Sequence, residues 1–287
     1  MVLCVLTAAS SAAPQGQGTA STHTAVLVGA GDIADCRSLD GAFATATLLD
    51  AIPGTVFTTG DNAYPNGTAQ QFAECYSPTW GRHRARTRPA VGNHDYHTTN
   101  AAHYFTYFGA AAGDPGKGYY SYDLGAWHVI VLNSNCDKIG CEPGSPQERW
   151  LREDLASRKT PCSLAYWHHP RFTSGVHGDA VEMTALWQAL YEGGVELGIS
   201  GHDHDYERFA PQTAAGLLDR ERGVRQFVAG TGGKKLRRFR QAKPNSEVRS
   251  NASLGVLKLT LRPRSYDWEF VPIAGGASVD SGTDTCR

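Results

Sequence analysis

The stretch that decides the fold is Ala25-Val26-Leu27-Val28-Gly29-Ala30-Gly31-Asp32, an apolar run that stops at a glycine and an aspartate. Similar short apolar runs recur at residues 55–61, 89–94, 163–168 and 195–202, and each stops at Asp, Asn or His. Runs of this length, rich in apolar and β-branched residues, are typical of buried β-strands. The chain therefore contains at least five strand candidates with a polar residue at the end.

Helical segments are expected between these strands. Residues 39–52 have a helical composition, so the chain should begin as a β-α-β unit. Ser145-Pro146-Gln147-Glu148 matches a capping box with proline at the first helical position, which predicts a helix through about Ser157. Another helix is expected to open at Asp179 and to end at Gly193-Gly194. Strand pairs are expected at residues 119–134 and 254–271. Strands mixed with helices predict an α/β protein with buried sheets.

Composition excludes several classes of protein. The chain has 287 residues, of which 41% are hydrophobic, and 27 basic residues balance 28 acidic ones to a formal charge of -1. A chain without basic excess is not expected to bind nucleic acid by bulk electrostatics, and it is not a charge-extended disordered chain. No stretch after the N-terminus approaches the roughly 20 apolar residues of a membrane-spanning helix. We therefore expect neither a nucleic acid nor a membrane as partner.

The N-terminus and the cysteines indicate an oxidising compartment. Residues 1–22 have a short apolar run followed by small residues, as in a signal-peptide remnant, with a disordered N-terminus as the alternative. Residues 23–287 are expected to form one domain. Cys4 would be removed with the signal, so six of the seven cysteines remain, and six cysteines allow 15 pairings. We expect a local Cys136–Cys141 bridge with Cys36–Cys75 and Cys162–Cys286 as long-range bridges, although the sequence alone does not exclude the other pairings. The expected location is secreted or otherwise extracytoplasmic.

Polar side chains gather at the strand ends. In open α/β sheets, ligands bind beyond the carboxyl ends of the strands, so residues distant in sequence converge there. Carboxylates and imidazoles in such numbers suit transition-metal ions, and a pair of ions about 3.5–4 Å apart needs a bridging carboxylate. The residues at these ends are Asp32, Asp61, Tyr64, Asn93, His94, His168, His202 and His204.

The order of these motifs resembles that of the calcineurin-like metallophosphoesterases, and more narrowly that of the purple acid phosphatases. The matching blocks are Gly31-Asp32, Gly60-Asp61-Asn62-Ala63-Tyr64, Gly92-Asn93-His94-Asp95, His168 and Gly201-His202-Asp203-His204. Most of the superfamily has a histidine ligand two residues after the first aspartate, where this chain has Ala34. The purple acid phosphatase branch has a tyrosine three residues after the second aspartate instead, and Tyr64 stands there. The resemblance covers residues 25–272 and is to the small single-domain form.

This resemblance implies a four-layer α/β/β/α sandwich of two mixed β-sheets flanked by helices. It implies one metal ion at Asp32, Asp61, Tyr64 and His204, and a second at Asp61, Asn93, His168 and His202. A phenolate ligand favours Fe(III) at the first position, whereas the second could take Fe(II), Zn(II) or Mn(II). A metal-bound hydroxide would then attack the phosphorus of the substrate.

Two further histidines are implied as catalytic residues. His94 follows Asn93 directly and is expected to face the phosphate, and His177 lies nine residues after His168, where the family has a substrate-facing histidine. The expected activity is hydrolysis of phosphate monoesters, with a small phosphorylated substrate and inorganic phosphate as product. The alternatives are a phosphodiesterase with the same metals and a non-catalytic secreted protein that binds metal or phosphate. The oligomeric state stays open.

Other residues are expected to have structural roles. His169 adjoins a ligand, but strand alternation would point it to the opposite face. The run Lys234-Lys235-Leu236-Arg237-Arg238-Phe239-Arg240 is expected to be a solvated loop, with steering of anionic substrates as the alternative. Structural roles are also expected for His23, His83, His97, His103 and His128, with His97 the first candidate for an exception because it flanks the third block.

Overall fold

A computed structural model describes residues 1–2, 23–277 and 280–287 of the chain. The expected signal-peptide remnant falls on residues 3–22, outside the described residues, apart from its first two positions. Among the described residues, no helix has the length and apolar character that crossing a bilayer requires.

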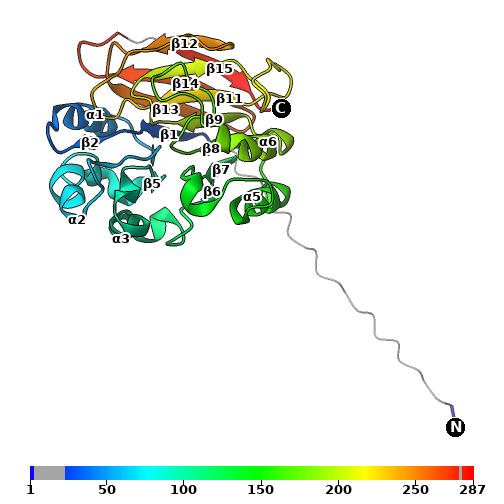
Figure 1. The fold of residues 1–287 in the computed structure, drawn as a ribbon. Coiled ribbons are helices and arrows are strands. Elements are labelled where there is room, and N and C mark those ends of the chain that lie inside the picture. The colour runs from blue at the N-terminus through cyan, green and yellow to red at the C-terminus, as the bar shows by residue number, and fades with distance from the viewer. Residues whose placement is uncertain (3–22, 278–279) are drawn as a thin grey trace.

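Two mixed β-sheets form the centre of the molecule (Figure 1). Both contain parallel and antiparallel pairs. In the first, β1 (Ala25–Ala30) pairs with β3 (Thr55–Thr58) in parallel and with β13 (Gly255–Arg262) in antiparallel orientation. In the second, β7 (Trp127–Val131) pairs with β8 (Cys162–Tyr166) in parallel and with β6 (Tyr120–Leu124) in antiparallel orientation. The first sheet has the order β15 (Ser281–Thr285), β14 (Ser265–Pro272), β13 (Gly255–Arg262), β1 (Ala25–Ala30), β3 (Thr55–Thr58) and β5 (Thr87–Pro89). The second has the order β12 (Ser246–Ser250), β10 (Tyr206–Phe209), β11 (Arg225–Ala229), β9 (Leu197–Ser200), β8 (Cys162–Tyr166), β7 (Trp127–Val131) and β6 (Tyr120–Leu124). A small two-stranded sheet joins β2 (Ala34–Asp35) to β4 (Ala63–Tyr64).

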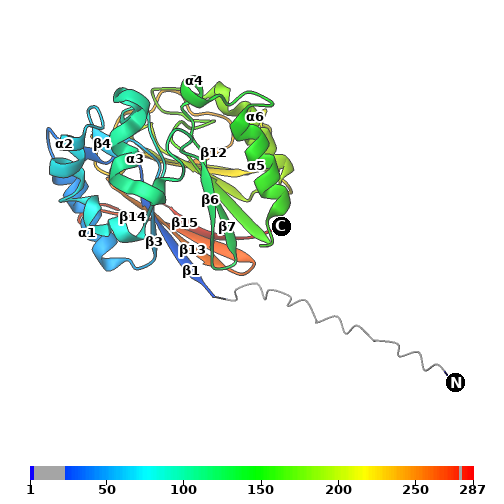
Figure 2. The same ribbon diagram turned by 90° about the horizontal axis from the view of Figure 1, so that it is seen from below.

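The sheets pack face to face and helices cover their outer faces (Figure 2). Side chains such as Leu27 and Phe57 of the first sheet meet Leu164 and Ile199 of the second in one buried cluster. On the outer face of the first sheet lie α1 (Asp40–Ala51), α2 (Ala69–Gln71) and α3 (Ala102–Phe108). On the outer face of the second lie α5 (Pro146–Ser157) and α6 (Thr184–Glu192), with the short α4 (Cys136–Ile139) near them. The predicted four-layer α/β/β/α arrangement is confirmed.

The two helices whose starts were predicted, at Ser145 and at Asp179, differ in whether the structure confirms the predicted N-cap. The Ser145 hydroxyl accepts a hydrogen bond from the Glu148 backbone N–H, as expected, while the Glu148 carboxylate accepts one from Gly144. The second helix begins later than predicted, with a 3₁₀ turn at Val181–Met183 before α6. Asp179 is not its cap, because its carboxylate accepts from the Thr173 N–H and pairs with Lys243.

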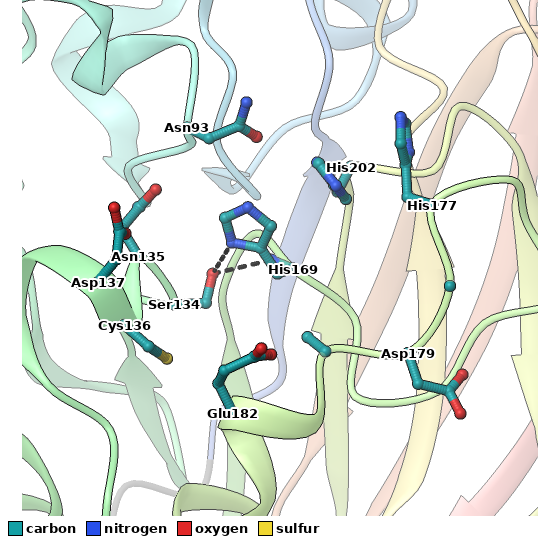
Figure 3. A pocket seen from close by; sticks show the side chains of 12 residues that line it. Asn93, Ser134, Asn135, Cys136, Asp137, His169, His177, Asp179, Glu182 and His202 are labelled. Carbon is teal, nitrogen blue, oxygen red and sulfur yellow. Dashed lines mark hydrogen bonds between the residues drawn. The ribbon is translucent and has the colours of Figure 1, made fainter.

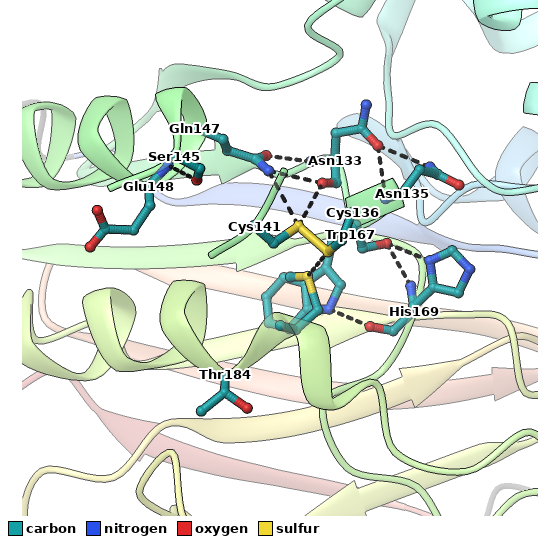
Figure 4. Close-up of a disulfide and its surroundings, with 12 residues drawn as sticks. Asn133, Asn135, Cys136, Cys141, Ser145, Gln147, Glu148, Trp167, His169 and Thr184 are labelled. Carbon is teal, nitrogen blue, oxygen red and sulfur yellow. Dashed lines mark hydrogen bonds between the residues drawn. A yellow bond between two sulfur atoms is a disulfide. The ribbon is translucent and has the colours of Figure 1, made fainter. Parts of the chain in front are cut away.

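All three predicted disulfides are present: Cys36–Cys75, Cys136–Cys141 and Cys162–Cys286. The Cys136–Cys141 bridge closes a short loop that follows β7 (Figure 4). Gln147 of α5 secures the same loop, because its side-chain amide exchanges two hydrogen bonds with the Asn133 backbone. This loop supplies Ser134 and Asn135 to the cavity described below.

Candidate metal centre

Five of the predicted site residues come shortly after five different strands and lie close together. Asp32 follows β1, Asp61 follows β3, Asn93 follows β5, His168 follows β8 and His202 follows β9. Three of these residues leave the strand in the left-handed region, with φ of 60° at Asp32, 51° at Asp61 and 67° at His202. Non-glycine residues rarely adopt this conformation, which costs of the order of 1–3 kcal/mol each and tends to occur at functional sites. The chain thus turns sharply at these three positions.

A first cluster consists of Asp32, Asp61, Tyr64 and His204, and all four side chains are buried. The Tyr64 hydroxyl lies 2.7 Å from Asp32 Oδ1, 2.8 Å from Asp61 Oδ2 and 3.3 Å from His204 Nε2. His204 Nε2 is also 3.3 Å from Asp32 Oδ1. Four potential ligand atoms therefore meet around one point.

A second cluster consists of Asp61, Asn93, His168 and His202. His168 Nε2 lies 2.9 Å from Asn93 Oδ1, 3.2 Å from His202 Nδ1 and 3.3 Å from Asp61 Oδ1. The His202 backbone N–H donates to Asp32 Oδ2, which ties this cluster to the first. The structure brings together all seven residues that the sequence resemblance implied.

Asp61 belongs to both clusters through different oxygens. Its Oδ2 faces Tyr64, and its Oδ1 faces His168 and accepts a hydrogen bond from the His94 backbone. A Cβ at Gly92 would lie 2.2 Å from both the Asp61 nitrogen and its Oδ1. Only glycine fits at position 92, because any side chain there would displace the shared carboxylate.

Backbone carbonyls orient two of the imidazoles. His168 Nδ1 lies 2.7 Å from the Thr59 carbonyl oxygen, and His204 Nδ1 lies 3.0 Å from that of Lys235. A carbonyl only accepts, so each ring donates from Nδ1 and directs its Nε2 toward the cluster. Backbone contacts of this kind fix metal-ligating histidines in many sites.

Charges at the centre are strongly coupled. Burial lowers the pKa of His168, but the Asp61 carboxylate raises it to about 9. Burial raises the pKa of Asp61, yet His168, His94 and His202 hold it below its ordinary value. Burial and the two carboxylates raise the pKa of Tyr64 well above its ordinary value. Two buried carboxylates, a phenol, an amide oxygen and three imidazoles form a donor set that fits transition-metal ions.

The two histidines predicted to be catalytic flank the clusters on opposite sides. The His94 ring is tilted against the Tyr64 ring with 4.4 Å between the ring centroids, and its Nδ1 lies 2.6 Å from the Pro65 carbonyl oxygen. His177 lies 4.2 Å from the His202 ring, measured between ring centroids. Its Nδ1 is 3.0 Å from Asp203 Oδ1. Both imidazoles can therefore reach a group bound between the clusters.

A comparison with protein-family models matches residues 21–206 to the calcineurin-like phosphoesterases. This chain belongs to that family. Its curated relatives include a probable purple acid phosphatase of Arabidopsis thaliana, 29% identical over 165 residues that cover 48% of this chain and 38% of the relative. Another Arabidopsis relative, named a probable inactive purple acid phosphatase, is 26% identical over 79% of this chain and 42% of its own length. The chain thus spans less than half the length of these plant relatives.

Among solved structures, a purple acid phosphatase from seeds of yellow lupin (Lupinus luteus) matches with a TM-score of 0.78. The match has 21% identity and covers 93% of this chain and 54% of the lupin chain. At that identity the likeness concerns the fold. The calcineurin-like phosphoesterase fold seen here therefore extends over nearly the whole described chain.

The sequence prediction for one residue beside the second cluster is wrong. His169 was expected to point away from His168, but its ring lies 4.5 Å from that of His202, and the nitrogens of these three histidines fall within 4.8 Å of one another. Strand alternation does not apply because β8 ends at Tyr166. Pro170 was the available signal, since proline disfavours continuation of a central strand.

The basic run at residues 234–240 is a loop in which Lys235, Arg237, Arg238 and Arg240 are exposed, as expected, but its backbone is also attached to the first cluster. The Lys234 backbone N–H donates to the Asp32 carbonyl, and that of Arg237 donates to the His204 carbonyl. The Lys234 ammonium pairs with Asp35 at 2.7 Å and lies 4.3 Å above the Tyr64 ring. The loop is therefore anchored on the first cluster, and Arg237 reaches His177 Nε2 at 3.1 Å.

His97 lies beside the site without joining either cluster. Its ring is 4.6 Å from that of His94, and its Nδ1 lies 3.1 Å from both the Pro65 carbonyl oxygen and the Asn66 side-chain oxygen. His94 and His97 therefore share the Pro65 carbonyl.

A cavity of about 320 Å³ opens beside the second cluster (Figure 3). Asn93 and His202 of the cluster border it, as does His177. The remaining lining residues come from the loops after β7 and β8 and from the start of the 3₁₀ turn: Ser134, Asn135, Cys136, Asp137, His169, Gly178, Asp179, Ala180 and Glu182.

Proposed function

We propose that this chain is a purple acid phosphatase-like metallophosphatase that hydrolyses phosphate monoesters. The observation that supports this best is the position of Asp61, which turns one carboxylate oxygen to each of two ligand clusters. A bridging carboxylate between two terminal ligand sets is what a two-metal phosphoesterase site requires. Family membership supports the reaction class, and the plant relatives named purple acid phosphatases support the branch.

The ligand sets follow the two clusters. Asp32, Asp61, Tyr64 and His204 would hold one ion, and Asp61, Asn93, His168 and His202 the other. Fe(III) suits the first set because phenolate and carboxylate are hard anionic ligands, and Fe(II), Zn(II) or Mn(II) suits the second set. Such ions supply hydroxide near neutral pH and neutralise the charge on phosphoryl oxygens.

The remaining residues of the chain would bind and orient the ester. In its doubly protonated form His94 would donate a hydrogen bond to a phosphoryl oxygen from Nε2, because its Nδ1 N–H is engaged by the Pro65 carbonyl and its Nε2 faces the clusters, 3.8 Å from Asp61 Oδ2. In its doubly protonated form, with Nε2 released from the Arg237 guanidinium, His177 would give a proton to the leaving alcohol, and Asp203 would fix the ring through Nδ1 and the His177 backbone N–H. Both roles require these rings to lie on either side of the phosphorus.

We also infer an extracytoplasmic location. Three disulfides are unusual in cytosolic proteins, whose thiols are kept reduced. The secreted or periplasmic space is the matching environment.

A non-catalytic metal or phosphate binder is the second candidate. It is favoured by relatives that are named probable inactive purple acid phosphatases. The presence here of all seven ligand candidates together with His94 and His177 favours the enzyme.

The test is a rate comparison on the metal-loaded protein with p-nitrophenyl phosphate and bis(p-nitrophenyl) phosphate. We expect faster hydrolysis of the monoester, and loss of it in Asp61→Asn but not in Asp114→Asn, an exposed carboxylate paired with Lys117. Faster hydrolysis of the diester would make the protein a phosphodiesterase. Bound metal without turnover of either ester would favour the non-catalytic binder.

A further inference from the structure

The cavity beside the second cluster lies where a leaving group would extend. Asn93, His202 and His177 form its inner end, and a phosphate held at the clusters would direct its ester oxygen past them. At about 320 Å³ it lies at the small end of ligand sites, which span roughly 300–1,000 Å³. We propose that this cavity is the leaving-group subsite and that it selects alcohols with an ammonium group, so that phosphate monoesters of amino alcohols are the preferred substrates. This inference rests on the proposed phosphatase function.

A hydrogen-bond acceptor on a largely buried residue faces this cavity. Asn135 lines the cavity and is only 3% exposed. Its Nδ2 donates to Asn133 Oδ1 and to the Val91 carbonyl, which fixes the orientation of the amide because both partners only accept. The Asn135 side-chain oxygen is then presented to the cavity, and no described residue donates to it. Because this oxygen is open to the cavity and can only accept, it suits a ligand that donates a hydrogen bond.

The charge of the lining also favours a donor. Asp137, Asp179 and Glu182 line the cavity, and no lysine or arginine does. Asp137 and Asp179 are paired with Lys138 and Lys243 outside the lining. Glu182 has no ion pair among the described residues, and Figure 3 shows its carboxylate directed toward His169. Glu182 interacts electrostatically with the Arg171 guanidinium, which is outside the lining, but its carboxylate has no ion-pair partner in the described part of the chain and is the one that an ammonium group would meet.

Donors and acceptors are separated along the cavity. At the inner end, Ser134 Oγ accepts from the His169 backbone N–H and lies 2.9 Å from His169 Nδ1. The serine proton has no other acceptor among the described residues, so it goes to Nδ1 and leaves His169 Nε2 as an N–H donor. A donor near the metals and acceptors farther out match an ester with an anionic phosphate and a cationic alcohol.

Three two-carbon phosphate monoesters test this selectivity. O-Phosphoethanolamine, 2-hydroxyethyl phosphate and phosphoglycolate have leaving groups of similar size with charges of +1, 0 and −1. For the metal-loaded protein we expect kcat/KM to fall in that order. Glu182→Gln should lower the ratio of the first to the second by about two- to fivefold, the range for one partly exposed ion pair. Glu182→Lys should favour phosphoglycolate. The control is Glu153→Gln on the exposed face of α5.

The outcomes separate this inference from the proposed function. Equal kcat/KM for the three esters, a preference for phosphoglycolate, or an unchanged ratio in Glu182→Gln would overturn the ammonium subsite. Turnover of p-nitrophenyl phosphate with none of the three esters hydrolysed would do the same. No turnover of any phosphate ester, nitrophenyl phosphate included, would instead overturn the phosphatase assignment.

Discussion

Replacing Asp61 by asparagine should remove the ion of the second cluster and weaken the ion of the first. In the second cluster, Asp61 is the only carboxylate, because Asn93, His168 and His202 are neutral ligands. The first cluster keeps Asp32 and Tyr64. Changing the outer partner of a ligand already costs 10–100-fold in metal affinity in other sites, so loss of the only anionic ligand should exceed ~100-fold, or ~2.7 kcal/mol.

The assay is metal analysis per chain after gel filtration, with circular dichroism to verify the fold. Wild type should retain two ions and Asp61→Asn at most one. Asp32→Asn and Asn93→Ala are the matched variants, since each changes a candidate ligand of one cluster only, and they should differ in which ion is lost. Two ions per chain in Asp61→Asn, bound as tightly as in wild type, would refute the bridging role.

Three further predictions concern colour, pH and disulfides. Tyr64→Phe should abolish the visible charge-transfer band of the iron-loaded protein, measured by absorption; a colourless iron-loaded wild type would contradict the Fe(III)–phenolate assignment. Burial lowers the pKa of His128, but Asp154 and Asp123 raise it above 6.5. The stabilisation of the folded state by protonated His128 is therefore complete below pH 6.5 and is lost as the pH rises through the pKa of His128 in the folded protein. His128→Asn should thus reduce the free energy of unfolding more at about pH 5.5 than at about pH 9, and a pH-independent effect would contradict this. Removing Cys162–Cys286, which spans 124 residues, should cost ~5 kcal/mol in chemical denaturation, against roughly 2 kcal/mol for Cys136–Cys141; equal losses would contradict the loop-length argument.

Local sequence patterns predicted much of the fold because each depends on a few neighbouring residues. The apolar runs that stop at Asp32, Asp61 and His202 became strands of the two sheets, and Ser145 became a helix cap. The Asp179 helix start was wrong. Its carboxylate accepts from the Thr173 backbone, six residues earlier, and pairs with Lys243, 64 residues later, so it does not cap the helix.

The sequence by itself determined which side chains meet. Parallel strands of one sheet end at a common edge, so the polar residues that follow β1, β3 and β5 converge, as do those that follow β8 and β9 in the other sheet. The order of the motifs and the tyrosine at position 64 fixed the family.

Only the tertiary structure decided how those side chains face one another. The packing of the two sheets and their loops directs one Asp61 oxygen to each cluster and places His169 beside the cavity. It also attaches the basic loop to Asp32 and His204 and leaves Glu182 without an ion pair among the residues that the structure describes. The physical reason is that periodicity assigns a face only within a regular element. These residues lie just beyond strand ends, where long-range hydrogen bonds and backbone turns set direction.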